Sequence, residues 1–235
     1  MEDLFGVHQK ARRQDSEHWI SLSDLMAGLM MVFLVISVAF MRYVQIERDK
    51  IKEVAIAYQN SQVALYEELK REFSEDLPVW DAEIEQSTLE FRFKSPDVLF
   101  ENAAIELRPQ FQLILDDFFP RYLRVLKRFD EHIQEIRIEG HTSSLWAGAT
   151  SPEEAYFNNM ELAQGRTRSV LHHIYTMQSV SDEKPWLREK FASIGYSSAH
   201  PVLKEDGSED SSRSRRVSFR VLTNAEIQIR RIIQE

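Results

Sequence analysis

The longest apolar run in the chain lies near its N-terminus, where residues 25–40 contain no charged side chain. Counted from Trp19 to Met41, a helix here would be about 34 Å long at ~1.5 Å per residue, enough to cross a hydrocarbon core of about 30 Å. The run is too long for a signal peptide, and no small-residue cleavage site follows it. The pattern predicts an uncleaved transmembrane helix over residues 19–43, after a short segment of mixed charge over residues 1–18.

One acidic residue, Asp24, interrupts the apolar pattern about one turn inside the Trp19 end. A carboxylate at membrane depth costs roughly 3 kcal/mol on insertion scales, so it is a functional candidate by default. Trp19 prefers the membrane interface, which places Asp24 inside the boundary. The alternative is a helix cap at headgroup level, following Ser21 and Ser23. The unbroken apolar sequence after Asp24 favours the intramembrane interpretation.

Residues 44–79 are expected to form a helical connector, because the stretch 43–73 contains neither Gly nor Pro and is rich in helix-forming residues. Two arrangements suit its apolar stripe: the helix packs on its own domain, or two copies pair in parallel. Because the helix leaves the membrane directly and its other faces are polar, the pattern favours pairing in a homodimer. The stripe is a weak heptad repeat of Val44, Ile51, Tyr58 and Leu65, with Val54 and Leu69 near the companion positions.

A compact domain is expected over residues 80–223, where strand-type and helix-type patterns alternate. Alternation with period two predicts strands at residues 88–93, 133–140, 191–196 and 216–222. Helical periodicity predicts helices at residues 109–128 and 159–177, with a last short helix within residues 224–235. This order predicts an α+β sandwich with helices covering one face of a sheet.

Composition narrows the functional classes. The chain of 235 residues has no cysteine, which excludes disulfides and thiolate metal sites. Its net charge of −9 argues against a dedicated nucleic-acid binder. No residue pair suggests a metal site, nucleophilic catalysis or a phosphate-binding loop, so we expect neither an enzyme nor a cofactor.

Four motifs in the second half of the chain together resemble the OmpA-like peptidoglycan-binding domain, over roughly residues 85–223. Each motif is weak alone, but their order and spacing make the resemblance specific. They are Ile136-Arg-Ile-Glu-Gly-His-Thr142, Asn159-x-x-Leu-Ala-x-x-Arg166-x-x-x-Val170, Gly195-Tyr-Ser, and Arg215-Arg-Val-Ser-Phe219.

Residues 23–36 independently resemble the transmembrane helix of the flagellar stator protein MotB, whose proton-carrying aspartate falls on Asp24. Within the MotB-like proteins, the chain looks most like the membrane subunits of Zorya anti-phage defence systems. The near-uninterrupted connector, the lack of a clear amphipathic plug and the additional C-terminal helix carry this resemblance. It implies a peptidoglycan-binding subunit of a proton-driven motor that serves antiviral defence.

Charge alone leaves the membrane orientation open, since basic residues lie on both sides of the span. Peptidoglycan lies outside the inner membrane, so the resemblance implies a single-pass inner-membrane protein. Its N-terminus is then cytoplasmic and its C-terminal domain periplasmic. The basic residues are Lys10, Arg12 and Arg13 before the span, and Arg42, Arg48, Lys50 and Lys52 after it.

Ion translocation needs a carboxylate that can be either charged or neutral, and removal from water favours the neutral form. Asp24 and Gly28 share one helical face, and the small Gly28 allows a partner helix to approach closely. A lone helix cannot shield Asp24. The resemblance implies a homodimer of this chain inside a ring of MotA-like membrane subunits, called ZorA in the defence system. Ser21 and Ser23 are candidate partners of the carboxylate or ion, although backbone capping suits them better.

For wall binding, the family ligand is a peptide stem bearing diaminopimelate, whose side chain carries a carboxylate and an ammonium. The resemblance implies that Arg166 clamps the carboxylate, with Asn159 and Leu162 completing the motif. A bidentate guanidinium suits such a group. Arg216 matches the strand motif and is a candidate support beneath the site.

The chain departs from the family at Ser143, where family members usually carry the Asp that meets the ligand ammonium. A serine accepts a hydrogen bond but does not neutralise an ammonium, so the departure predicts a lower affinity or a different ligand. Candidate substitutes are Glu139, Glu153 and Glu154. Two rival functions also stay open at this point: a flagellar-type stator, and a passive tether between inner membrane and wall without ion transport.

Overall fold

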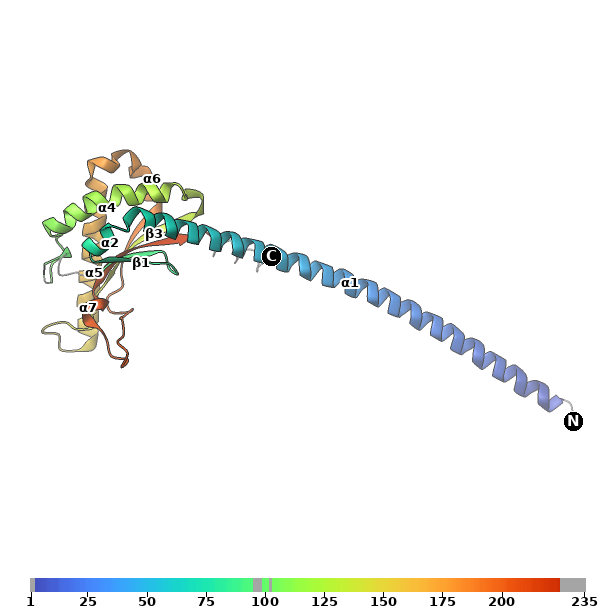
Figure 1. The fold of residues 1–235 in the computed structure, drawn as a ribbon. Helices are drawn as coiled ribbons and strands as arrows, with labels where there is room; N and C mark the ends of the chain where they lie inside the picture. The colour runs from blue at the N-terminus through green and yellow to red at the C-terminus, as the bar shows by residue number, and fades with distance from the viewer. Residues whose placement is uncertain (1–2, 95–98, 102, 225–235) are drawn as a thin grey trace. The chain divides into compact units, whose positions relative to one another are not determined.

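The computed structural model describes residues 3–94, 99–101 and 103–224, and it divides the chain into two compact units, Met1–Glu53 and Val54–Glu235. Helix α1 (Asp3–Phe73) begins in the first unit and ends in the second (Figure 1). The short helix expected within residues 224–235 lies outside the described residues.

The first unit is the N-terminal part of α1. Its segment Leu22–Glu53 is long and apolar enough, by length and composition, to cross a membrane, and an 18-residue stretch within it has a mean hydropathy of 2.3. The large apolar side chains of this segment, such as Leu29 and Phe33, are exposed in the single chain. The single apolar helix and the helical connector expected from the sequence are therefore confirmed.

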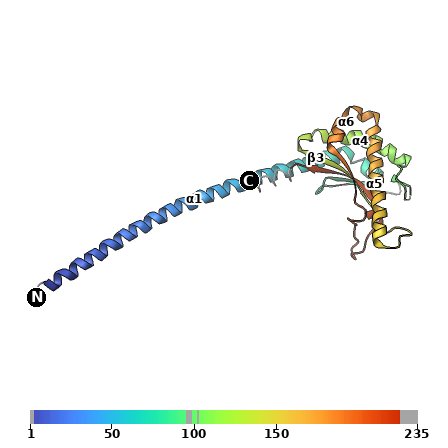
Figure 2. The same cartoon turned by 180° about the vertical axis from the view of Figure 1, so that it is seen from behind.

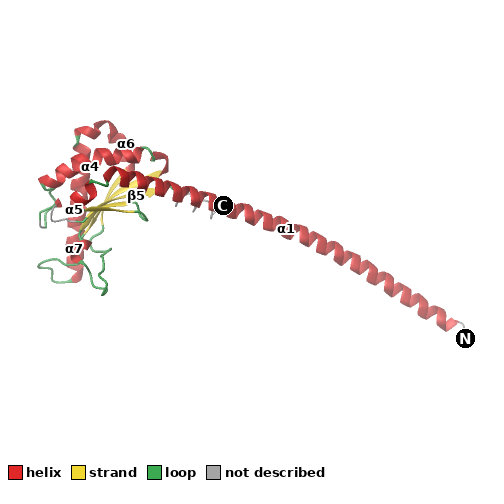
Figure 3. Ribbon diagram, viewed as in Figure 1, coloured by secondary structure: helices red, strands yellow, loops and turns green. Residues whose placement is uncertain are grey.

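The second unit contains a five-stranded sheet in the order β1-β2-β5-β3-β4 (Figure 3). The only parallel pair in this sheet is β3 with β4, and the other neighbours are antiparallel. The sequence pattern located four of the strands and missed β1, whose length leaves little room for a periodic signal. The strands are β1 (Ala82–Glu85), β2 (Glu90–Phe93), β3 (Ile133–His141), β4 (Phe191–Gly195) and β5 (Arg216–Thr223).

Helices pack on one face of this sheet, as the α+β pattern predicted. Helix α5 begins seven residues before the predicted start, because Ser151 caps it by accepting a hydrogen bond from the Glu154 N–H and Pro152 occupies its first turn. Figure 2 shows α5 beside β3. The described helices of the unit beyond α1 are α2 (Asp76–Val79), α4 (Pro109–Lys127), α5 (Pro152–Thr176), α6 (Lys184–Lys190) and α7 (Ser211–Ser214), with 3₁₀ turns η1 (Asp130–His132) and η2 (Gln178–Glu183).

The end of α1 belongs to the domain core. Leu65, Leu69 and Phe73 are fully buried, and the Phe73 ring lies 5.3 Å from the rings of both Phe91 and Phe118. The core thus begins well before residue 80, where the sequence pattern placed the domain. For Leu65 and Leu69, the favoured interpretation as positions of a paired helix gives way to packing on the chain's own domain, while pairing of the segment before residue 54 stays a prediction.

Two glycines bring α5 unusually close to the sheet. Gly140 of β3 and Gly195 of β4 are register partners. A Cβ atom added at Gly140 would lie 2.8 Å from the Ala163 carbonyl oxygen, and one added at Gly195 would lie 2.5 Å from the Gln164 nitrogen. The two positions therefore need glycine, and this contact fixes the middle of α5 against the ends of the two parallel strands.

Candidate functional sites

Asp24 lies within α1, and its side chain is exposed in the single chain. It makes no hydrogen bond or ion pair with any residue the structure describes. A Cβ added at Gly28, one turn later, would meet no atom within 4 Å. The helix is already formed from Asp3, so neither Asp24 nor Ser23 caps a helix start, and capping does not explain the acid. The side chain of Ser21 lies outside the described set.

Arg166 is buried on α5, and it holds the segment before α4 in place. Its Nε donates to the Ala104 carbonyl oxygen at 2.9 Å, and its Nη2 donates to that of Glu101 at 3.3 Å. The guanidinium also lies 4.7 Å from the centre of the Phe100 ring. At least two of the guanidinium donors of Arg166 are therefore used by backbone carbonyls, and its role in ligand binding stays a prediction.

Asn159 is a buried residue of α5, and it fixes the loop between β3 and α5. Its Nδ2 donates to the Leu145 carbonyl oxygen at 3.2 Å. Ser143, in the same loop, is buried as well, and its neighbour Ser144 donates from its backbone N–H to the Glu209 carboxylate at 3.1 Å. The structure thus brings Asn159 and the Ser143 loop together.

The three candidate substitutes for the missing family aspartate differ in what surrounds them. Glu154 accepts hydrogen bonds from the N–H and hydroxyl of Thr150, at 2.7 and 2.6 Å. Glu139 alternates with Gly140 along β3, so its side chain lies on the sheet face opposite α5. Glu153 stands in the first turn of α5, where it complements the helix dipole.

Arg216 also lies on the sheet face opposite α5, since its register partner is His141 and the adjacent pair is Gly140 with Val217. Its Nη1 donates to the carbonyl oxygens of Ser214 at 3.0 Å and His200 at 3.3 Å. The structure therefore does not bring Arg216 together with Arg166. Arg216 instead holds the loop that leads into β5.

A buried polar cluster occupies that opposite face. Ligand atoms of Glu90, Glu139 and His141 all lie within 4.8 Å of one another, which is a geometry that could hold a metal ion. The arginines around them already balance both carboxylates: Arg92 lies 2.9 Å from Glu90, Arg216 lies 3.9 Å from Glu90, and Arg220 lies 3.9 Å from Glu139. We therefore interpret the cluster as a charge-balanced core network rather than a metal centre.

Burial lowers the pKa of His141, although the neighbouring Glu139 opposes this effect. Burial alone would raise the pKa of Glu90, but the hydrogen bonds from Arg92 hold it below its usual range. Both groups therefore favour the folded domain at neutral pH, with His141 neutral and Glu90 charged.

Mild acid is expected to destabilise the domain through His141. Because the folded state lowers this pKa, the unfolded chain binds the proton more readily once the pH falls below about 6.5, at a cost of at most about 1.4 kcal/mol per pH unit. The unfolding temperature should be lower at pH 5.5 than at pH 7.5, and this difference should be smaller in His141→Gln than in wild type. The exposed His132→Gln control should retain the full drop, and an equal pH dependence in His141→Gln would contradict the assignment.

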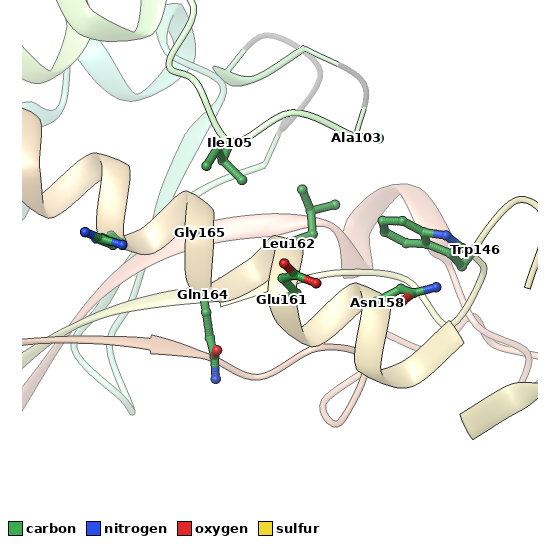
Figure 4. Close-up of a pocket in the computed structure, with 9 residues that line it drawn as sticks. Ala103, Ile105, Trp146, Asn158, Glu161, Leu162, Gln164 and Gly165 are labelled. Atoms are coloured by element: carbon green, nitrogen blue, oxygen red, sulfur yellow. The ribbon is translucent and has the colours of Figure 1, made fainter. Parts of the chain in front are cut away.

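A surface cavity of about 500 Å³ lies between α5, the β3–α5 loop and the segment before α4. Figure 4 shows Trp146 facing Leu162, with the Glu161 carboxylate beside Leu162 and Ile105 over Gly165. Among the predicted wall-binding residues, Leu162 lines this cavity, whereas Arg166, Asn159, Ser143 and Arg216 do not. The described lining comprises Ala103, Ile105, Trp146, Asn158, Glu161, Leu162, Gln164, Gly165 and Arg168.

The spacing of residues in the sequence indicates this cavity, but the comparison of motifs did not identify it. Asn158, Glu161, Gly165 and Arg168 follow one another at spacings of three and four residues, which places them on one face of a helix. That face adjoins the one carrying the motif residues.

No family model matches the chain. The chain is 60% identical to the Zorya protein ZorB of Escherichia coli over the full length of both proteins. A MotB-like protein from Desulfovibrio vulgaris is 21% identical, with 70% of this chain and 93% of that one covered and a TM-score of 0.49. The type VI secretion cell wall anchor of Pseudomonas aeruginosa is 20% identical, with 66% and 96% covered and a TM-score of 0.47.

Proposed function

The chain belongs to the ZorB family of Zorya proteins, and on that basis we propose that it is the membrane-anchored, peptidoglycan-binding subunit of a proton-driven motor that serves anti-phage defence. The single observation that carries the motor is Asp24, an acid within the apolar part of α1 that no helix start explains. A passive tether would have no use for a carboxylate at that depth.

In this proposal Asp24 carries the translocated ion. Two copies of α1 lie side by side, and MotA-like ZorA subunits form a ring around them. The open surface at Gly28 lets a neighbouring helix approach on the face that bears Asp24. Each proton that binds and leaves draws on a membrane potential worth about 2.3 kcal/mol per charge per 100 mV. Ser23 and Ser21 lie within one turn of Asp24 along the sequence, and the proposal assigns them as further candidate partners of the ion.

The proposed orientation follows from the location of peptidoglycan outside the inner membrane. Residues 1–18 face the cytoplasm, residues 19–43 cross the inner membrane, and the second unit lies in the periplasm, where peptidoglycan is found. Asp24 then lies toward the cytoplasmic side of the bilayer. Proton uptake at Asp24 is thus separated along the chain from anchoring by the domain.

The proposed wall site is the α5 side of the domain. Arg166 and Asn159 hold the two segments that border the cavity, namely the segment before α4 and the β3–α5 loop. Leu162 supplies part of the cavity's apolar wall. These residues position the site, and an approaching ligand carboxylate would compete with backbone carbonyls for Arg166.

Replacing Arg166 by alanine should weaken binding of the full-length protein to purified sacculi by about tenfold or more. The change leaves the carbonyl oxygens of Glu101 and Ala104 without their charged donor and frees the border of the cavity. Co-sedimentation of the detergent-solubilised protein with sacculi measures this, with the exposed Arg124→Ala on α4 as the matched control. Unaltered sedimentation of Arg166→Ala would count against the wall site.

A further inference from the structure

Strand β5 ends beside the point where α1 enters the second unit. A small cavity of about 170 Å³ at this point is lined by Gln62 of α1, residues 87–89 and residues 220–223. The Nε2 atom of Gln62 donates to the carbonyl oxygens of Gln86 and Ser87, at 3.1 and 2.7 Å. Counted from the N-terminus, Gln62 is the first residue of α1 with a hydrogen bond to the rest of the domain, within the part of the chain that the structure describes. The chain therefore leaves β5 at the edge where α1 enters.

The apolar stripe of α1 continues beyond this edge. Leu65 and Leu69 are fully buried in the domain core. Val54 and Tyr58 precede them in the sequence, so that the four positions follow one another at spacings of four, seven and four residues. Such spacings place all four on one face of a helix. Because exposure of an apolar stripe to water is unfavourable, the part of the stripe before Gln62 needs a surface to cover it.

Asn224, the last described residue, has the geometry to begin a helix. Its backbone N–H donates to the His132 carbonyl oxygen at 3.0 Å, and its Nδ2 donates to that of Glu131 at 2.6 Å. Its Oδ1 atom is buried and has no hydrogen-bond partner among the residues that the structure describes. Asparagine is a favoured N-cap residue, whose side-chain oxygen accepts a hydrogen bond from a backbone N–H two or three residues later. Asn224 therefore offers an acceptor for a helix that begins at residue 225.

The sequence that follows Asn224 matches the stripe in character and in length. Ala225, Ile229, Ile232 and Ile233 are spaced as one apolar face of a helix. As a helix, residues 225–235 would span about 16 Å at ~1.5 Å per residue. The distance along α1 from Gln62 back to position 54 is about 12 Å on the same measure. A helix of this length that starts at the edge of the domain can therefore reach position 54.

We propose that residues 225–235 form a helix that packs along residues 54–62 of α1 in the same chain. Ile229, Ile232 and Ile233 cover the part of the apolar stripe that carries Val54 and Tyr58. The C-terminal helix thus fastens α1 to the domain where α1 leaves it. It also occupies a face that a second copy of α1 would otherwise use, so pairing of two copies is confined to the segment before residue 54.

Disulfide trapping tests this contact, because the chain contains no cysteine of its own. In the full-length protein in nanodiscs, Val54→Cys is combined in turn with Ile229→Cys, Ile232→Cys and Ile233→Cys. Mild oxidation should give a disulfide within one chain in at least one pair, seen as a monomer whose thiols no longer react with maleimide after denaturation. The control Ile56→Cys, at a position that is 59% exposed, should form no disulfide with the same three partners.

Hydrogen exchange tests the helical form of the segment. Ile229→Ser should speed amide exchange in residues 54–62 by about tenfold or more, because α1 loses part of its cover there and opens locally more often. Ile227→Ser is the matched control, since this isoleucine falls on the opposite side of the expected helix. It should leave exchange in residues 54–62 unchanged. Equal effects of the two substitutions would overturn the helical packing.

Other results would identify a different cover for this face. A disulfide-linked dimer of the paired variants would show that the segment packs on a second copy. A dimer formed by Val54→Cys alone would show that α1 of a second copy lies there instead. If no disulfide forms and Ile229→Ser leaves exchange unchanged, residues 225–235 do not pack on α1. Each of these three results overturns the proposal.

Discussion

Cells that produce the Asp24→Asn variant are expected to lose protection from phage completely, with expression and membrane insertion unchanged. Asparagine nearly matches aspartate in size and can still hydrogen-bond, but it neither binds nor releases a proton at physiological pH. If the motor steps only when Asp24 changes its charge, a permanently neutral side chain stops it. Insertion should even become slightly easier, because the uncharged amide is less costly in lipid than a carboxylate.

The matched control for this experiment is Asp49→Asn, on the same helix but beyond the proposed membrane-spanning residues 19–43. It removes the same charge from a part of α1 that the proposal places outside the membrane, so protection should remain. Plaque counts report protection, and membrane fractionation reports insertion. Full protection by Asp24→Asn would remove the ion-carrying role and favour a passive tether. Rescue of a motility defect by the wild-type chain would instead favour a flagellar-type stator.

Replacing Phe73 by alanine is expected to lower the unfolding free energy of the domain by about 3–5 kcal/mol. The Phe73 ring is fully buried among Trp80, Phe91 and Phe118, so its loss leaves a cavity that these rings cannot readily fill. Chemical denaturation of residues 54–235 measures the effect. The exposed Phe157→Ala should change stability by at most about 0.5 kcal/mol.

Truncation tests the same boundary more severely. A fragment of residues 54–235 should unfold cooperatively, whereas a fragment of residues 80–235 should not, because it lacks Leu65, Leu69 and Phe73 and exposes the core surface that they cover. Equal unfolding temperatures for the two fragments would show that the end of α1 is not part of the folding unit.

The pattern of the chain was most informative where one periodicity extended over many residues. The apolar run, the connector, four strands and α4 were all located from it. The connector's stripe was real, but Leu65 and Leu69 pack on the chain's own domain. The period of a pattern shows which face of a helix is buried but not which surface covers that face. The sequence therefore could not distinguish packing on the chain's own domain from pairing with a second copy.

Motif matching found the neighbourhood of the candidate wall site but did not distinguish lining from supporting residues. Arg166 and Asn159 stand on the inner side of α5, whereas Glu161 and Arg168 line the cavity. The difference depends on how α5 is rotated about its axis. That rotation is fixed by the close contacts at Gly140 and Gly195, which join segments far apart in the sequence. The face of the sheet that carries Arg216 could not be predicted for a similar reason, because it depends on strand register.

The last turns of α1 are held by an arginine of α4 and by the arginine that follows α4, and these contacts determine how the helix end would respond to a pulling force. Arg121 of α4 grips the last turn, with its Nε 2.8 Å from the Glu72 carboxylate and its Nη2 2.7 Å from the Glu72 carbonyl oxygen. Arg128 holds Glu68 one turn earlier, at 2.9 Å. If the chain links the wall to the membrane as proposed, tension would pull this helical end along its neighbour and load all of these contacts in shear at once. Under that proposal, the end of α1 would pass force to the domain through a rigid attachment.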